Sequence, residues 1–287
     1  MPKVSIVIPC YNHGLFLKES VDSVLAQTFQ DFEIIIVNDG STDPNTLEII
    51  RNWSSPKTIV ITTPNSGPAM ARNKGINIAR GDYIVALDAD DVIEHTYIEK
   101  CVSVLEGDEN IGIVYARARY FGAKKGKWNL PDFNPLFFLF ENCIYCAAMF
   151  KRQDWASVGG YNDNVDGLED WDFWLSLITL GCSVHRIDEE LFFYRKHRFE
   201  KAKKGNGIGG EKNLSQSVSN SIIQNKDRYS MVKQQIIKNH ISLYEQNLDK
   251  LVLLLMENSI LFTSDAKKLL STKITPSKKI KVFIESA

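Results

Sequence analysis

The chain has few of the sequence features that mark zinc-binding, disulfide-rich, membrane-spanning or secreted proteins. Its 287 residues include only five cysteines, and the one close pair, Cys143 and Cys146, has no second pair with which to form a structural zinc site. An odd number of cysteines in a chain of this length argues against a disulfide framework. No stretch reaches the ~18 uninterrupted apolar residues of a membrane-spanning helix, and the N-terminus lacks the basic and apolar segments of a signal peptide. We therefore expect a cytoplasmic protein.

Net charge is also nearly absent, but its distribution is uneven. The chain has 34 Lys and Arg against 35 Asp and Glu, a total of −1, which excludes the basic profile of a general nucleic-acid binder. Residues 1–200 hold 19 basic and 28 acidic side chains, whereas residues 201–287 hold 15 basic and 7 acidic ones. With 44% apolar and 24% charged residues, the composition is that of a folded domain.

The first 90 residues alternate between Val- and Ile-rich runs and segments with helical spacing. Such short apolar runs suit strands that are buried on both faces of a sheet. The βαβαβαβ order predicts an α/β fold with a mainly parallel, Rossmann-like sheet and helices on both of its faces. The predicted strands span 4–8, 34–37, 58–62 and 82–87, and helices are expected over 15–25, over 45–53 with Asp43 as the N-cap, and over 68–79.

Beyond residue 110 the pattern is less regular. We expect strands at 113–119 and 144–150 and a helix that opens at 169. A Gly- and Lys-rich segment, 200–217, reads as a loop or linker. Residues 218–287 are expected to form a basic helical extension. Within it, apolar residues between 231 and 262 recur at spacings of four and three, as in a short coiled-coil seam.

Polar residues follow all four predicted parallel strands, and ligands of such sheets bind beyond the carboxyl ends of the strands. No GxGxxG follows the first predicted strand and no GxxxxGK[ST] occurs, so neither the dinucleotide fingerprint nor the P-loop is available there. Asp88 and Asp90, two residues apart, suit Mg²⁺ or Mn²⁺ with a substrate phosphate; alternatively they only end a strand and cap a helix. Asp39 is placed to accept from a base or a ribose, or to form a turn. Arg72 suits a phosphate, or a surface salt bridge.

Five segments together resemble the motif series of the nucleotide-sugar-dependent glycosyltransferases of family 2. The order of the motifs and the intervals between them match, and the resemblance covers residues 3 to 198. It implies a GT-A fold and an inverting transfer of a sugar from a nucleoside diphosphate, UDP by family habit, to an acceptor hydroxyl, with Mn²⁺ or Mg²⁺ on the diphosphate. The segments are VSIVIPCYN (4–12), EIIIVNDGSTD (33–43), NSGPAMARNKG (65–75), GDYIVALDADD (81–91) and LEDWDFWLSL (168–177).

The resemblance also implies which parts of the chain bind the donor and which bind the acceptor. Residues 1–199 would form the catalytic domain, with a nucleotide-sugar half at 1–110 and an acceptor half at 111–199. Four residues would surround the nucleoside, with Asp39 reading the base, and further residues would lie near the donor. The predicted nucleoside residues are Pro9, Tyr11, Asn12 and Asp39, and the other donor residues are Arg72, Asn73, Asp88 and Ala89.

For the chemistry, the resemblance implies metal contact by Asp90, with Asp88 at the metal or the ribose and His197 as a further ligand. Asp170 would be the general base, because one carboxylate near the acceptor hydroxyl suffices for an inverting displacement. Glu169 is the alternative base, and either acid could instead stabilise the first turn of its helix. Trp171 is expected to stack on the acceptor sugar.

The expected function is a metal-dependent glycosyltransferase of surface polysaccharide or glycan synthesis, with a glycan, lipid-linked or protein-linked acceptor. One alternative, a nucleotidyltransferase, would need an early basic Gly-rich loop that is absent. The other, a non-catalytic sugar-nucleotide-binding scaffold, is disfavoured by the intact carboxylates at 88, 90 and 170. The basic extension could pack on the catalytic domain, associate with a second copy through residues 231–262, or bind the inner face of a membrane as a peripheral contact.

Overall fold

The computed structural model of the protein describes most of the first 198 residues, all of which belong to one of two units into which the chain divides, Met1–Gly209. The predicted linker, basic extension and coiled-coil seam lie outside the described residues, so the boundary at 199 stays a prediction. In the described part of the chain, no helix is long and apolar enough to cross a membrane. The described residues are 1–134, 138, 142–165 and 167–198.

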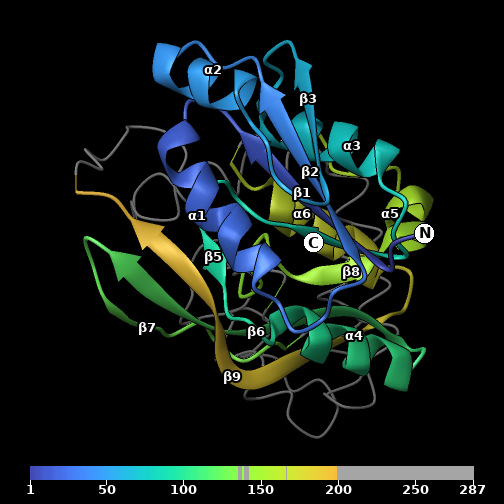
Figure 1. Ribbon diagram of the computed structural model, residues 1–287. Coiled ribbons are helices and arrows are strands. Elements are labelled where there is room, and N and C mark those ends of the chain that lie inside the picture. The colour runs from blue at the N-terminus through green and yellow to red at the C-terminus, as the bar shows by residue number, and fades with distance from the viewer. Residues whose placement is uncertain (135–137, 139–141, 166, 199–287) are drawn as a thin grey trace, which may run out of the picture. The chain divides into compact units, whose positions relative to one another are not determined.

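The N-terminal half confirms the predicted alternation of strands and helices. Its four strands are parallel and stand in the order β3-β2-β1-β4, so the chain crosses back over β1 after β3 (Figure 1). Helices pack on both faces of the sheet (Figure 1). The elements are β1 (Val4–Cys10), α1 (Gly14–Leu25), β2 (Phe32–Asp39), α2 (Pro44–Arg51), β3 (Thr58–Thr63), α3 (Gly67–Ile78) and β4 (Tyr83–Ala86).

Local details differ from the sequence pattern in two places. β1 and β2 are buried on both faces as expected, but β3 lies at the edge of the sheet, and Ile59 on it is 43% exposed. On α1, Leu15 faces solvent instead of joining the apolar stripe, because the helix turns Leu17 and Val21 toward the core. The predicted cap is confirmed: Asp43 accepts a 2.8 Å hydrogen bond from the backbone N–H of Thr46.

The second half adds antiparallel pairings to the sheet, which remains mainly parallel as predicted. β8 joins β4 in antiparallel register, β6 follows β8, and β9 runs parallel to β6 over a long ladder. Of the predicted strand at 144–150, only the end is extended, as β8. The elements are β5 (Val92–Ile93), α4 (Tyr97–Gly107), β6 (Ile111–Gly122), β7 (Gly126–Trp128), β8 (Met149–Lys151), α5 (Arg152–Ser157), α6 (Glu169–Ile178) and β9 (Ser183–Lys196).

This topology decides what surrounds the end of β4. Strand β9 pairs with β6 on one side and with β5 on the other, so the residues that end β9 come to the acidic segment after β4. Helix α6 packs against α3, and the first turn of α6 therefore faces the same segment from another side. Three parts of the chain that are far apart in sequence thus converge on Asp88–Asp91.

Candidate active site

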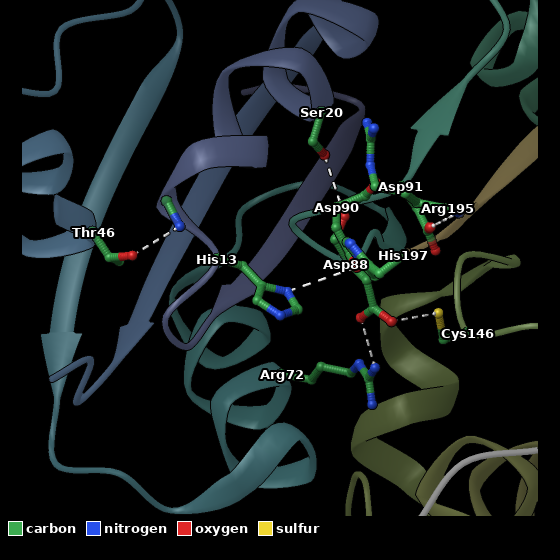
Figure 2. A network of polar contacts seen from close by, with 11 residues as sticks. His13, Ser20, Thr46, Arg72, Asp88, Asp90, Asp91, Cys146, Arg195 and His197 are labelled. Carbon is green, nitrogen blue, oxygen red and sulfur yellow. Dashed lines mark hydrogen bonds and ion pairs between the residues drawn. The ribbon is translucent and has the colours of Figure 1, made fainter. Parts of the chain in front are cut away.

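The carboxylate of Asp88 lies at the centre of a polar network after β4 (Figure 2). Its Oδ1 accepts a 2.8 Å hydrogen bond from Nη2 of Arg72, and its Oδ2 accepts a 3.4 Å contact from the thiol of Cys146. The hydroxyl of Ser20 donates to its backbone carbonyl over 3.3 Å. Both carboxylate oxygens of Asp88 therefore have partners within the protein, which fixes the direction of this side chain.

Asp90 faces two histidines. Its Oδ2 lies 2.7 Å from Nε2 of His197, at the end of β9, and 3.7 Å from Nδ1 of His13, just before α1 (Figure 2). The rings of His13 and His197 have centroids 5.9 Å apart. The predicted pairing of Asp90 with His197 in space is thus present in the structure, and His13 is a neighbour that the sequence pattern did not indicate.

Asp91 fastens the end of β9 to the end of β4. Its Oδ1 accepts a 2.8 Å hydrogen bond from the backbone N–H of Arg195, whose side-chain Nε donates to the carbonyl of Asp90 over 2.7 Å. The Asp91 side chain is completely buried, and its Oδ2 has no hydrogen-bond partner among the residues that the structure describes. Burial, reinforced by the charge of Asp90, raises the pKa of Asp91 well above its usual range. Through its Oδ1, Asp91 therefore has a structural role at the end of β9.

Arg72 is the cation that joins the two acidic motifs. It extends from α3, its side chain is only 4% exposed, and its Nη1 donates a 2.7 Å hydrogen bond to Oε1 of Glu169, the first residue of α6. Burial alone would lower the pKa of this guanidinium, but the charges of Asp88 and Glu169 outweigh burial and raise it. The alternative of a surface salt bridge is therefore wrong, because Arg72 is a buried bridge between β4 and α6.

Asp170 follows Glu169 and is only partly buried. Its Oδ1 accepts a 2.7 Å hydrogen bond from the N–H of Trp171, and its Oδ2 accepts one of 3.3 Å from Nδ2 of Asn142. Burial, followed by the charge of Glu169, raises the pKa of Asp170 to about 7, while the charge of Arg72 opposes the rise. This carboxylate therefore titrates near neutral pH, as a general base needs.

The predicted nucleoside residues line the ends of β1 and β2. Tyr11 is 47% exposed, and Asn12 takes a left-handed backbone conformation with φ 59°. Its side-chain oxygen accepts hydrogen bonds from the N–H groups of residues 42 and 43, both at 2.8 Å. Asp39 is 3% exposed and accepts from the N–H groups of Ser66, at 3.0 Å, and Gly67, at 2.9 Å. Both side chains hold loops that border the site.

Two residues with predicted ligand contacts make hydrogen bonds within the protein. The amide of Asn73 is turned toward the loop before α6: it donates to the carbonyl of Tyr161 over 2.7 Å and accepts from Trp155 and from the N–H of Tyr161. Trp171 is 6% exposed, and its indole N–H donates to the carbonyl of Phe138 over 2.8 Å. Both side chains therefore hydrogen-bond to residues between 138 and 161, and their contact with a ligand stays a prediction.

Comparison with known proteins decides the family. The model of the family described as Glycosyl transferase family 2 matches residues 5–158, more than half of the chain. The chain belongs to glycosyl transferase family 2. It therefore carries a glycosyltransferase domain, and the expected resemblance is confirmed.

The family 2 chain is 29% identical over 294 residues to a chondroitin synthase of Pasteurella multocida (strain Pm70), a match that covers 99% of this chain and 29% of that protein. It is 34% identical over 191 residues to a hyaluronan synthase of Pasteurella multocida, covering 64% of this chain and 20% of that protein. The chain thus spans less than a third of the length of these relatives. Among solved structures, S. aureus TarS 1-349 in complex with UDP-GlcNAc matches with a TM-score of 0.64 at 15% identity, covering 98% of this chain and 89% of that chain. This match confirms the GT-A fold.

Three polar neighbours of the family 2 site escaped the sequence analysis. His13 follows the Tyr11-Asn12 motif directly, so its place at a strand end was the available signal. Cys146 reads as a small apolar residue of a CxxC pair, and only the fold brings its thiol to Asp88. Asn142 lies in an aromatic segment with no motif, and nothing in the sequence links it to Asp170.

A metal site is incomplete in the described part of the chain. No group of three or more His, Cys, Asp or Glu side chains is arranged there to hold an ion by itself. Asp88 has both oxygens engaged, so the donors that fit a divalent metal are the carboxylate of Asp90 and the imidazole of His197. Carboxylate oxygens suit Mg²⁺ and Mn²⁺, and phosphate oxygens commonly complete the shell of such ions. The donor set fits a metal that is shared with a diphosphate.

Proposed function

We propose that the chain transfers a sugar from a nucleoside diphosphate sugar to an acceptor hydroxyl with inversion at the anomeric carbon, and that Asp170 is the general base. One observation carries the proposal. Asp170 is a half-buried carboxylate at the start of α6, and Glu169 and the Arg72 bridge connect it to the acidic segment after β4. Arg72 thus connects the helix that carries the proposed base to the acidic segment where we place the donor diphosphate.

The reaction follows from this arrangement. The carboxylate of Asp170 takes the proton of the acceptor hydroxyl, and the freed oxygen lone pair forms a bond to the anomeric carbon. The bond between that carbon and the diphosphate oxygen breaks on the opposite face, and its electron pair leaves with the diphosphate. With a pKa of about 7, Asp170 is basic enough to accept the proton and largely ionised just above neutral pH.

In the same proposal, Asp90 and His197 would hold Mn²⁺ or Mg²⁺ beside the donor diphosphate. When bound, such an ion would supply positive charge against the charge of the departing diphosphate. Asp88, whose direction is fixed by Arg72, lies with Ala89 beside the donor ribose. Arg72 itself has a positioning role, because both of its carboxylate partners are protein groups.

For the donor we propose a UDP-sugar, since two solved TarS structures hold UDP and UDP-GlcNAc. The nucleoside would be bordered by Pro9, Tyr11, Asn12 and Asp39. To contact the nucleobase, Asp39 would accept one more hydrogen bond in addition to those from the N–H groups of Ser66 and Gly67. For the acceptor we propose a glycan chain, in line with the relatives named chondroitin synthase and hyaluronan synthase. A cytoplasmic location follows from these roles as part of the same proposal.

The test is release of UDP from a panel of UDP-sugars with Mn²⁺ and glycan acceptors. We expect Asp170→Asn to keep donor binding, measured by calorimetry, while transfer falls at least about a hundredfold, the usual contribution of a general base. Asp163→Asn, in the exposed turn before α6, is the matched control and should stay active. Near-normal transfer by Asp170→Asn would refute the base assignment, and an α-configured donor yielding an α-linked product would refute inversion.

A further inference from the structure

Strands β6, β7 and β9 run together in one part of the sheet (Figure 1). Three aromatic rings from these strands contact one another there. Tyr120 and Tyr194 are partners in the β6–β9 ladder, with centroids 6.2 Å apart. Trp128 of β7 stacks on Tyr120 at 5.4 Å with an interplanar angle of 22°, and its ring lies 4.9 Å from that of Tyr194. We call this group the aromatic platform.

The rings of the aromatic platform are partly exposed, and positive charge lies beside them. The ammonium of Lys124 lies 4.5 Å from the centre of the Tyr120 ring, and that of Lys196 lies 4.6 Å from the centre of the Tyr194 ring. The turn between β6 and β7 adds one more exposed lysine, Lys125. A cluster of flat apolar faces bordered by cations is unusual for a surface that only faces water.

The turn is held in place and is part of the same sheet as the site. Gly122 has a φ of 83°, and an added Cβ there would lie 2.7 Å from the carbonyl of Lys196. That same carbonyl accepts a 2.8 Å hydrogen bond from the N–H of Ala123. The platform is therefore fastened to the end of β9, whose next residue is His197 beside Asp90.

The platform also borders the acidic segment through Tyr194. Burial, together with the nearby charges of Asp91, Asp88 and Asp90, raises the pKa of this phenol, so the hydroxyl stays protonated and able to donate. Arg195, the next residue, binds Asp91 and Asp90 from the other side of the strand. The platform and the acidic segment are thus joined by two consecutive residues of β9, Tyr194 and Arg195.

We propose that the aromatic platform, with Lys124 and Lys196, binds the acceptor glycan, and that this glycan carries carboxylates, as in uronic acid residues. The inference rests on the proposed function in so far as the glycan is the acceptor. The apolar C–H faces of a pyranose pack on aromatic faces, and the lysines make charge-assisted hydrogen bonds to carboxylates. A neutral glycan would use only the rings, so the charge of the ligand is the specific part of the proposal.

The experiment measures binding by calorimetry in the full-length protein. The probes are a hexasaccharide of alternating uronic acid and N-acetylhexosamine residues and the same hexasaccharide with its carboxylates reduced to alcohols. We expect the acidic form to bind about tenfold more tightly than the reduced form. Trp128→Ala should weaken binding of both forms about tenfold, whereas Trp128→Phe should keep most of the affinity. Lys124→Glu should weaken binding of the acidic form only.

The matched control is Lys57→Glu. The ammonium of Lys57 also lies over an aromatic ring, 4.2 Å from the centre of Phe32, but at the opposite end of the parallel strands. We expect unchanged hexasaccharide binding in this variant, and unchanged thermal unfolding in all four variants. Equal affinity for the acidic and reduced forms, or wild-type affinity in both Trp128→Ala and Lys124→Glu, would overturn the proposal.

Two further readouts separate this proposal from others. Hydrolysis of the UDP-sugar without acceptor tests the proposed function alone, and we expect Trp128→Ala to keep it while the KM for the acidic acceptor rises. Absence of donor hydrolysis in every variant, with hexasaccharide binding intact, would count against the transfer reaction and leave the glycan surface standing. Binding to vesicles of anionic phospholipid through Trp128 and Lys124, without binding of the hexasaccharide, would overturn it in favour of a membrane contact.

Discussion

The pKa of Asp170 makes a quantitative prediction about how transfer depends on pH. A base with a pKa of about 7 is about one tenth ionised at pH 6 and about nine tenths ionised at pH 8. Because only the ionised form accepts the acceptor proton, kcat/KM should rise about tenfold between pH 6 and pH 8. A carboxyl group at the ordinary value of 3.8 would be fully ionised over this range and would give a flat profile.

The assay is the initial rate of UDP release at subsaturating acceptor from pH 5.5 to 8.5, with Mn²⁺ saturating at each pH. Asp163→Asn should show the same rise in rate between pH 6 and pH 8 as the wild type, which we call the acidic limb of the profile. Asp170→Asn should lose this rise together with most of the rate. A flat wild-type profile over this range, with the enzyme stable throughout, would refute the base assignment and the electrostatic reasoning behind it.

The same shift predicts an effect on folding stability, with a sign that can be worked out. The folded pKa of Asp170 is raised, so ionisation is disfavoured in the folded state, and stability is lost as pH rises through about 7. The shift corresponds to about 4 kcal/mol in full, and water screens part of it because Asp170 is partly exposed. We expect Asp170→Asn to be more stable than wild type at pH 8 by about 1–2 kcal/mol in urea unfolding. This advantage should shrink toward pH 5, and a less stable variant at pH 8 would contradict it.

Three further predictions concern single side chains. Arg72→Met should lower the free energy of unfolding by about 3–5 kcal/mol, because it leaves two carboxylates without their buried cation, and should move the acidic limb of any residual activity to higher pH. Gly160→Ala should be more destabilising than Gly159→Ala in thermal unfolding: both glycines have a φ near 80°, but only at 160 would the new Cβ clash, 2.6 Å from Oδ1 of Asn73. His197→Ala should raise the Mn²⁺ concentration for half-maximal activity about tenfold or more, and an unchanged Mn²⁺ titration would remove this residue from the metal site.

The sequence is sufficient for the features of the fold that depend on local pattern. The runs that form β1 and β2 are almost wholly apolar, so their burial follows from composition alone. β3 has the same composition but lies at the edge, because its place depends on the crossover of the chain after α3. The long ladder between β6 and β9 pairs residues some 70 positions apart in the sequence, and no local sequence pattern predicts such a pairing.

In the candidate site, too, some features follow from the local sequence and others depend on distant parts of the chain. The positions of Asp88, Asp90 and Asp170 at element ends could be read from the sequence, since strand ends and helix starts have recognisable patterns. The directions of side chains could not, because they are set by partners elsewhere. Asn73 serves the loop before α6, and Trp171 is buried against Phe138, although both belong to motifs that suggest ligand contact.

The place of β9 in the chain has a consequence for when the protein becomes active during its synthesis. The parallel strands and their acidic segment leave the ribosome first, whereas the partners of Asp90 and Asp91 are supplied by residues 195 and 197. Domains fold as the chain emerges, so β4 is in place before the strand that completes it. A nascent chain that ends before β9 therefore carries Asp90 and Asp91 without the groups that orient them, although Asp88 already has Arg72 and Cys146. This part of the site is completed only when residues 195–197 have been synthesised.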